Sequence, residues 1–165
     1  EIDSDAVVHT LTLLIERCGE GVSAFALDLC TVLSDHFLRT APDLSSARER
    51  EDQDVGEEEG EQALAAAAVL QALGALFAAS ATHQEVFPQM EERLLPLFRA
   101  LLQRQRQEYF DDTLDLLTRF THYAPAISSS IWTIFGTVYA CFRDFAVDYF
   151  PDMLSLIDHY TVRDP

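Results

Sequence analysis

The sequence contains few of the residues on which common catalytic and metal-binding motifs depend. Its 165 residues include six glycines and three cysteines. No phosphate-binding loop, dinucleotide-binding glycine pattern or G-x-S-x-G motif is present. Cys18, Cys30 and Cys141 are far apart, and no C-x-x-C or nearby cysteine–histidine pair indicates zinc. Because each cysteine lies in an apolar run, we expect buried, free thiols in a reducing, intracellular compartment.

The histidines and carboxylates are also poorly spaced for catalysis. No two histidines are four residues apart, and no H-E-x-x-H motif occurs. The adjacent Asp111 and Asp112 point in different directions on a helix, and they suit a first turn, where the helix dipole stabilises acids. We therefore assign no catalytic, cofactor-binding or metal-binding residue, and an enzyme is the least favoured class of function. The five histidines are His9, His36, His83, His122 and His159.

Basic residues are scarce. The chain has 11 basic residues against 28 acidic ones, which gives a net charge of -17 at pH 7. A surface this acidic repels phosphate backbones and anionic lipids, so nucleic acid and membrane surfaces are poor candidate partners. Two interpretations of the charge remain open: it attracts a basic protein partner, or it serves solubility alone.

No charged residue occurs between residues 63 and 81. A membrane-spanning helix needs about 20 apolar residues, so this stretch is close to the required length. However, it is dominated by alanine, which contributes little apolar area but favours helix formation and close helix packing. We therefore predict a helix that is buried on most sides inside a soluble array, and no membrane insertion.

Helical periodicity dominates the rest of the chain. Apolar residues recur at steps of three and four, and no convincing strand pattern appears. Gly19, Pro42 and Pro125 mark breaks between the periodic segments. Short breaks imply antiparallel neighbours, so we predict an all-α fold of about seven helices. The predicted helices cover residues 4–18, 22–39, 62–80, 83–103, 108–123, 128–143 and 147–160.

The apolar stripes of these helices identify the predicted core. Trp132, Phe135 and Tyr139 form an aromatic stripe, which we interpret as core between neighbouring units rather than as a ligand site. The first two helices have equally clear stripes on single faces. Their members are Val7, Val8, Leu11, Leu14, Ile15 and Cys18 in the first helix, and Phe25, Leu29, Val32, Leu33 and Phe37 in the second.

Residues 41–61 form a strongly acidic segment with almost no apolar side chains. Such a segment cannot bury enough surface to offset the entropy of ordering it, so we predict a disordered acidic loop. Two interpretations are equally good: a solvated insertion, or an electrostatic contact for a basic partner. The second interpretation gives the candidate cargo-binding residues, which are Asp54, Glu57, Glu58, Glu59 and Glu61.

An internal repeat indicates the architecture. Tyr109-Phe110 recurs forty residues later as Tyr149-Phe150. At the same offset Asp112 matches Asp152, Leu114 matches Leu154, Leu116 matches Leu156, and Leu117 matches Ile157. A period near forty with two helices per unit is typical of HEAT or armadillo repeats. One helix pair cannot bury both of its apolar faces, so we expect a curved solenoid of stacked antiparallel pairs. We take residues 1–165 as one HEAT-repeat segment and expect it to be a fragment of a larger solenoid.

The order of these segments resembles the importin-β family of nuclear transport receptors, and within it the later repeats of the importin seven and importin eight branch. The two Tyr-Phe helix starts and Trp132 between them are the most specific part of the resemblance. The resemblance extends over essentially the whole chain. Its other stretches are the helix pair around residues 13–16 and 22–29, the acidic loop, the small-residue helix at 65–76, and residues 108–116, 127–132 and 148–154.

This resemblance implies a soluble, non-enzymatic receptor that shuttles between cytoplasm and nucleus through the nuclear pore. It implies basic cargo proteins such as ribosomal proteins and histones, contact with nucleoporins, and regulation by the GTPase Ran through the parent protein. Ran engages mainly the amino-terminal repeats in this family, and we expect those to lie outside this segment, so no Ran-binding residue is assigned. The alternative functions are a HEAT scaffold of another complex, such as a phosphatase assembly subunit, and, more distantly, an enzyme of unknown type.

Overall fold

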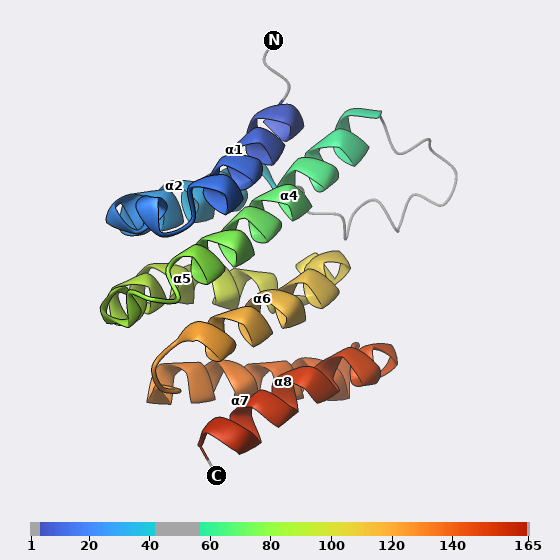
Figure 1. Cartoon of the computed structure of the whole chain (residues 1–165). Helices are drawn as coiled ribbons and strands as arrows, with labels where there is room; N and C mark the ends of the chain where they lie inside the picture. Colours follow the sequence, from blue (N-terminus) through green and yellow to red (C-terminus); the bar gives the residue numbers. More distant parts are fainter. Residues whose placement is uncertain (1–3, 42–56, 165) are drawn as a thin grey trace.

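The computed structural model describes residues 4–41 and 57–164, and over these ranges it is all-α (Figure 1). It has seven α-helices and four short 3-10 segments in the described residues, which confirms the predicted fold class. The α-helices are α1 (Ser4–Cys18), α2 (Ala26–Thr40), α4 (Glu57–Ala79), α5 (Phe87–Leu101), α6 (Phe110–Tyr123), α7 (Ser129–Asp144) and α8 (Phe150–Arg163). The 3-10 segments are η1 (Gly19–Phe25), η2 (Gln84–Val86), η3 (Arg104–Tyr109) and η4 (Val147–Tyr149).

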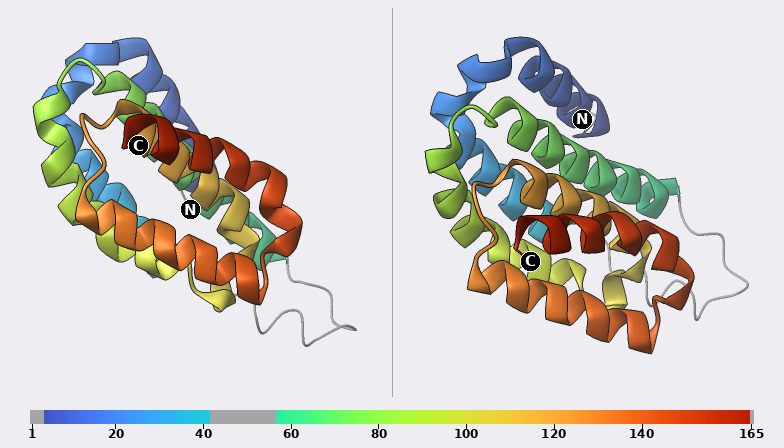
Figure 2. Two further views of the ribbon diagram at one scale, coloured as in Figure 1. Left: turned by 90° about the horizontal axis from the view of Figure 1, so that it is seen from below. Right: turned by 60° about the horizontal axis from the view of Figure 1, so that its bottom comes forward.

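The helices stack in two layers, and the chain alternates between them (Figures 1 and 2). In the first layer α1 packs on α4, α4 on α6, and α6 on α8. In the second layer α2 packs on α5 and α5 on α7. Helices within a layer run in the same direction, so successive helices form antiparallel pairs (Figure 1). This arrangement agrees with a HEAT-type solenoid, in which each unit contacts only its neighbours.

The core between α4, α5 and α6 is built around aromatic rings. The ring of Phe120 lies 5.3 Å from that of Phe77, 5.7 Å from that of Phe87 and 6.1 Å from that of Phe98, measured between centroids. All four rings are buried. Such tilted and edge-on pairs add to the stabilisation from apolar burial, so Phe120 joins three helices into one core.

Helix α4 is the alanine-rich helix, and it lies at the centre of the stack. It contacts α1, α2 and α6, and Val69, Ala72 and Leu73 are fully buried. By length and composition, the described residues contain two helical stretches apolar enough to cross a membrane: Gly60–Ala79, with a mean hydropathy of 1.7, and Ala6–Thr40, with 1.2. In the first, 56% of the most apolar window is buried inside the protein, as expected for the central helix of a stack.

The predicted acidic loop ends earlier in the structure than the sequence indicated, because α4 begins at Glu57. We expected a disordered loop over residues 41–61, but Glu57, Glu58, Glu59 and Glu61 belong to α4. Acidic side chains interact favourably with the amino-terminal end of a helix dipole, which explains why an acidic run can begin a helix. Residue 41 follows α2 with extended backbone. The rest of the predicted loop, residues 42–56, lies outside the described residues.

Candidate functional site

The amino-terminal ends of α4, α6 and α8 lie along one edge of the stack (Figure 1). Because the first-layer helices run in the same direction, acidic residues that begin each helix accumulate at this edge. We define the acidic edge by its exposed or half-exposed carboxylates, which come from three successive units. They are Glu61 on α4; Asp111, Asp112 and Asp115 on α6; and Asp148 and Asp152 at the start of α8.

Like charges crowd one another on this edge. The pKa of Asp112 is raised, first by its partial burial and then by repulsion from Asp111 and Asp115. A positive charge placed nearby would relieve this repulsion. The edge is not uniformly negative. Asp115 itself forms an ion pair with Arg119 at 2.7 Å, and Arg104 and Asp144 form an exposed ion pair with a nitrogen–oxygen distance of 3.3 Å. The acidic edge therefore carries net negative charge, although arginine side chains neutralise some of its carboxylates.

The structure describes four of the five predicted cargo-binding residues. Glu61 is exposed near the start of α4, on the acidic edge. Glu57, Glu58 and Glu59 belong to the same first turns of α4, and Asp54 lies outside the described residues. The repeat offset matched Asp112 with Asp152, but it did not indicate that both residues lie on the same edge of the stack as the start of α4. Only the parallel direction of the first-layer helices brings these acids together.

Several side chains near the other end of α8 contact backbone carbonyl oxygens of neighbouring helices. His159 Nδ1 lies 3.1 Å from the carbonyl oxygen of Thr118, and Arg163 donates to the carbonyl oxygen of His122 at 2.9 Å. The hydroxyl of Tyr160 donates to the carbonyl oxygen of Ile131 at 2.8 Å. Among the described residues no group of three or more His, Cys, Asp or Glu side chains is placed to hold a metal ion. The contacts of His159, Tyr160 and Arg163 hold α8 against α6 and α7.

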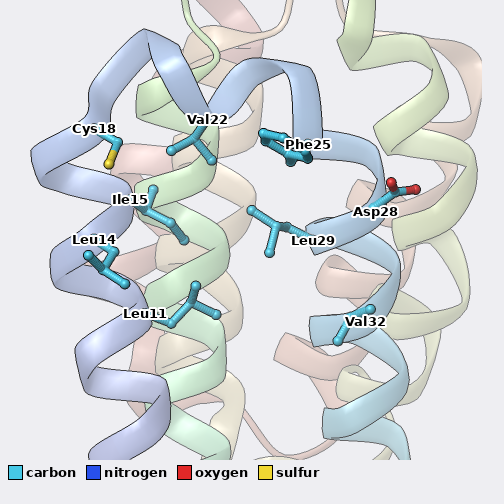
Figure 3. A pocket seen from close by; sticks show the side chains of 9 residues that line it. All are labelled: Leu11, Leu14, Ile15, Cys18, Val22, Phe25, Asp28, Leu29 and Val32. Atoms are coloured by element: carbon cyan, nitrogen blue, oxygen red, sulfur yellow. The ribbon is translucent and has the colours of Figure 1, made fainter.

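An open groove of about 340 Å³ lies between α1 and α2, at one end of the stack (Figure 3). Its lining is apolar except for Asp28. The predicted stripes placed Leu14, Phe25 and Val32 in the core, and this was wrong for the described residues: Leu14 is 54% exposed and Phe25 63% exposed. Only half of each stripe, such as Val8 and Ile15 on α1, packs on the next unit. The exposed half faces away from the stack, and no helix of residues 4–41 or 57–164 covers it.

The aromatic stripe of α7 shows the same behaviour at the other end. We interpreted Trp132, Phe135 and Tyr139 as core between units, but Trp132 is 37% exposed and Tyr139 is more exposed still. Only Phe135 is partly buried, with its ring 4.5 Å from that of Tyr160. Trp132 uses its indole nitrogen to donate to Asp164 at 2.7 Å. The stripe thus lies at an open end of the stack.

Comparison with known proteins identifies relatives of one kind. No family model matches the chain, and no solved structure does. The chain is 28% identical to the importin beta-like SAD2 homolog of Arabidopsis thaliana over 165 residues, covering 99% of this chain and 15% of that protein. Over nearly its whole length, the chain is similar to importin-β-like proteins.

Two further relatives agree. The chain is 28% identical to the probable importin-7 homolog of Dictyostelium discoideum, covering 97% of this chain and 14% of that protein. It is 24% identical to human importin-8, covering 99% of this chain and 15% of that protein. The chain therefore spans only about one seventh of the length of these importin-like relatives. The relatives' names agree with the resemblance found in the sequence.

Proposed function

We propose that this chain is a segment of an importin-like nuclear transport receptor, and that it holds basic cargo proteins by its acidic edge. The observation that carries the proposal is the recurrence of exposed carboxylates on three successive units of a chain whose net charge is -17 and whose sequence includes a strongly acidic segment. Similarity to importin-like proteins over nearly the whole chain supports it. Histones and ribosomal proteins are basic and are suitable cargoes for such an edge.

The proposed mechanism is electrostatic and involves no chemical reaction. Carboxylates spaced along a solenoid can contact a long basic segment at several points, and each contact adds a modest amount of free energy. Release follows when Ran-GTP binds elsewhere on the parent protein and changes the curvature of the array. The parent protein would also contact nucleoporins and shuttle between cytoplasm and nucleus. None of these steps requires a cofactor or a catalytic residue of this chain.

Carbodiimide cross-linking is well suited to test this proposal because the chain contains no lysine. A carbodiimide joins carboxylates to amines, so apart from the terminal amine every link must involve an amine of the partner. We expect cross-links from Asp111, Asp115 and Asp152 to lysines of core histones. We also expect the apparent affinity to fall steeply between low and physiological salt, because the contacts are exposed to solvent.

A matched pair of triple variants separates the acidic edge from net charge alone. The edge variant carries Asp111→Asn, Asp115→Asn and Asp152→Asn. The control removes the same charge from exposed residues away from this edge, with Glu16→Gln, Glu92→Gln and Asp158→Asn. Glu16 and Asp158 lie toward the carboxyl ends of α1 and α8, and Glu92 lies in the amino-terminal half of α5, which runs in the opposite direction. We expect the edge variant to bind histones roughly tenfold more weakly, a loss of about 1.4 kcal/mol, and the control to bind almost normally. Equal weakening by both variants would refute the proposed site.

The role of Ran can be tested separately on the longer parent protein. Ran-GTP should displace the bound histone from the parent but should not displace it from the 165-residue chain. A scaffold subunit would instead copurify with its enzyme whether Ran-GTP is present or not, and that result would reject the transport function.

A further inference from the structure

Arginines lie beside the acidic edge, on the second layer of the stack. The second-layer helices run opposite to those of the first layer, so they end at the edge where α4, α6 and α8 begin (Figure 1). Each second-layer helix among the described residues carries one arginine in its last turn, and all three arginines are exposed. We define the arginine row by these residues: Arg39 on α2, Arg99 on α5 and Arg143 on α7.

The arginine row has no carboxylate partners, although carboxylates are abundant. The chain has 28 acidic residues against 11 basic ones. Within residues 4–41 and 57–164, however, none of the three arginines forms an ion pair, and Arg39 donates to the backbone carbonyl oxygen of Asp35 on its own helix. The helix dipole favours a cation at the carboxyl end of a helix, which accounts for one arginine per helix. It does not occupy the N–H donors of the guanidinium groups, so most of these donors are open to the oxygen atoms of a partner.

One internal carboxylate shows how an acid binds at this end of the second layer. Both carboxylate oxygens of Asp144, which follows Arg143 at the end of α7, lie 3.3 Å from a guanidinium nitrogen of Arg104. Arg104 belongs to η3, the link that follows α5. In the same link the guanidinium of Arg106 lies over the ring of Phe37, 5.3 Å from its centroid, near the end of α2. These arginines extend the positive charge of the row between neighbouring helices.

The acidic edge and the arginine row form two lines of opposite charge. Packed helices lie about 8–10 Å apart, both between layers and along a layer. The two lines are therefore separated by about 10 Å, and each advances by about 10 Å from one unit to the next. A partner that lies along this end of the stack meets carboxylates on one side and arginines on the other.

We propose that the arginine row makes the acidic edge selective for partners of mixed charge, in which a line of acidic residues lies beside the basic residues. The inference rests on the proposed binding of basic cargo by the acidic edge. A uniformly basic partner pairs with the edge but places positive charge against the row, whereas a mixed partner pairs with both. Specificity then comes from repulsion of the wrong partner as well as attraction of the right one.

An α-helix with lysines along one flank and glutamates along the other has the dimensions for this surface. Its diameter of about 10–12 Å matches the separation of the two lines. At a rise of about 1.5 Å per residue, the step from one unit to the next corresponds to about seven residues. A helix that repeats both charges every seven residues therefore keeps one lysine and one glutamate facing each unit.

Two synthetic helical peptides of about 21 residues, or three such repeats, test the proposal. Both peptides carry lysines on one flank. The opposite flank carries glutamates in the lysine–glutamate peptide and glutamines in the lysine–glutamine peptide. Binding to the 165-residue chain is measured by fluorescence anisotropy at physiological ionic strength, where exposed charges more than about 8 Å apart are largely screened.

The variants reverse one exposed charge at a time. Arg99→Glu and Arg143→Glu act on the row. Arg17→Glu is the matched control, because Arg17 is also exposed in the last turn of its helix but lies at the opposite edge of the stack. We expect each row variant to bind the lysine–glutamate peptide about threefold to tenfold more weakly and the lysine–glutamine peptide about twofold to threefold more tightly. The control should bind both peptides almost normally.

The direction of these changes separates this inference from the proposed function. If the row variants shift the binding of both peptides in the same direction, or if Arg17→Glu has the same effects, the arginine row does not select partners. The edge variant should bind both peptides more weakly. Normal binding of the lysine–glutamine peptide by the edge variant, or no binding of either peptide by the unaltered chain, would instead refute the acidic edge as a cargo site.

Discussion

Replacing Phe120 tests the energetic centre of the stack. Phe120 is 1% exposed and contacts rings from α4 and α5, so Phe120→Ala removes apolar contacts between two successive units. Truncation of a buried phenylalanine costs about 3–5 kcal/mol. Loss of three ring pairs, each worth about 0.5–1.5 kcal/mol, places the expected cost at the upper end of that range. With about 2–4 °C per kcal/mol for a chain of this size, the melting temperature should fall by roughly 10–20 °C.

Urea denaturation followed by far-UV circular dichroism measures the change in the free energy of unfolding, and a thermal melt measures the change in melting temperature. The matched control is Phe25→Ala, since Phe25 has the same side chain but is 63% exposed, and we expect its cost to remain below about 1 kcal/mol. Phe120→Leu, which keeps much of the apolar volume, should fall between the two. If Phe120→Ala costs no more than Phe25→Ala, the rings do not form the core between units, and the assignment of the energetic centre is wrong.

Three further predictions concern thiols, a buried hydroxyl and two glycines. Native protein should be alkylated at Cys18 only, because Cys30 and Cys141 are buried and burial raises the pKa of the Cys30 thiol to about 12. Mass spectrometry after brief labelling checks this prediction, and rapid labelling of Cys30 would contradict it. Tyr160→Phe should lower the free energy of unfolding by about 1 kcal/mol because it removes the hydrogen bond to Ile131, whereas Tyr139→Phe at an exposed position should change it little. Gly136→Ala should stabilise α7 by roughly 0.5–1 kcal/mol, since beyond the adjacent residues and the backbone of α7 itself no atom lies within 4 Å of the added methyl group. Gly19→Ala should instead destabilise by about 1–2 kcal/mol because Gly19 has a φ of +50°. Changes of the same sign in thermal melts would refute this account.

Apolar periodicity and composition were sufficient to predict the number and order of the α-helices in the described residues. The 3.6-residue pattern is present in the helices that pack one face against the stack, but it is nearly absent from the alanine-rich α4, which was recognised by its composition instead. The break at Gly19 was predicted correctly, and its positive φ explains why glycine occupies it. The repeat offset also predicted the two-helix unit, because Phe110 and Phe150 begin successive first-layer helices.

Burial could not be predicted from the same pattern. An apolar stripe indicates that a surface must be covered, but it does not reveal whether the covering unit is present. Leu14, Phe25 and Trp132 were therefore assigned to the core although they are exposed. Composition also failed at Glu57, because an acidic run is compatible both with a solvated loop and with the start of a helix. The acidic edge depends on the relative direction of the first-layer helices, which no local pattern encodes.

The acidic edge follows partly from the fold itself. A carboxylate in the first turn of a helix is stabilised by about 0.3–1 kcal/mol, so a layer of helices that run in one direction gathers negative charge at one edge. This effect accounts for one or two acids at each helix start. Asp115 lies farther along α6, where its carboxylate forms an ion pair with Arg119 at 2.7 Å. Partial burial, followed by repulsion from Asp111 and Asp115, still raises the pKa of Asp112. The matched triple variants measure whether these carboxylates also bind a basic partner, which helix stability alone does not require.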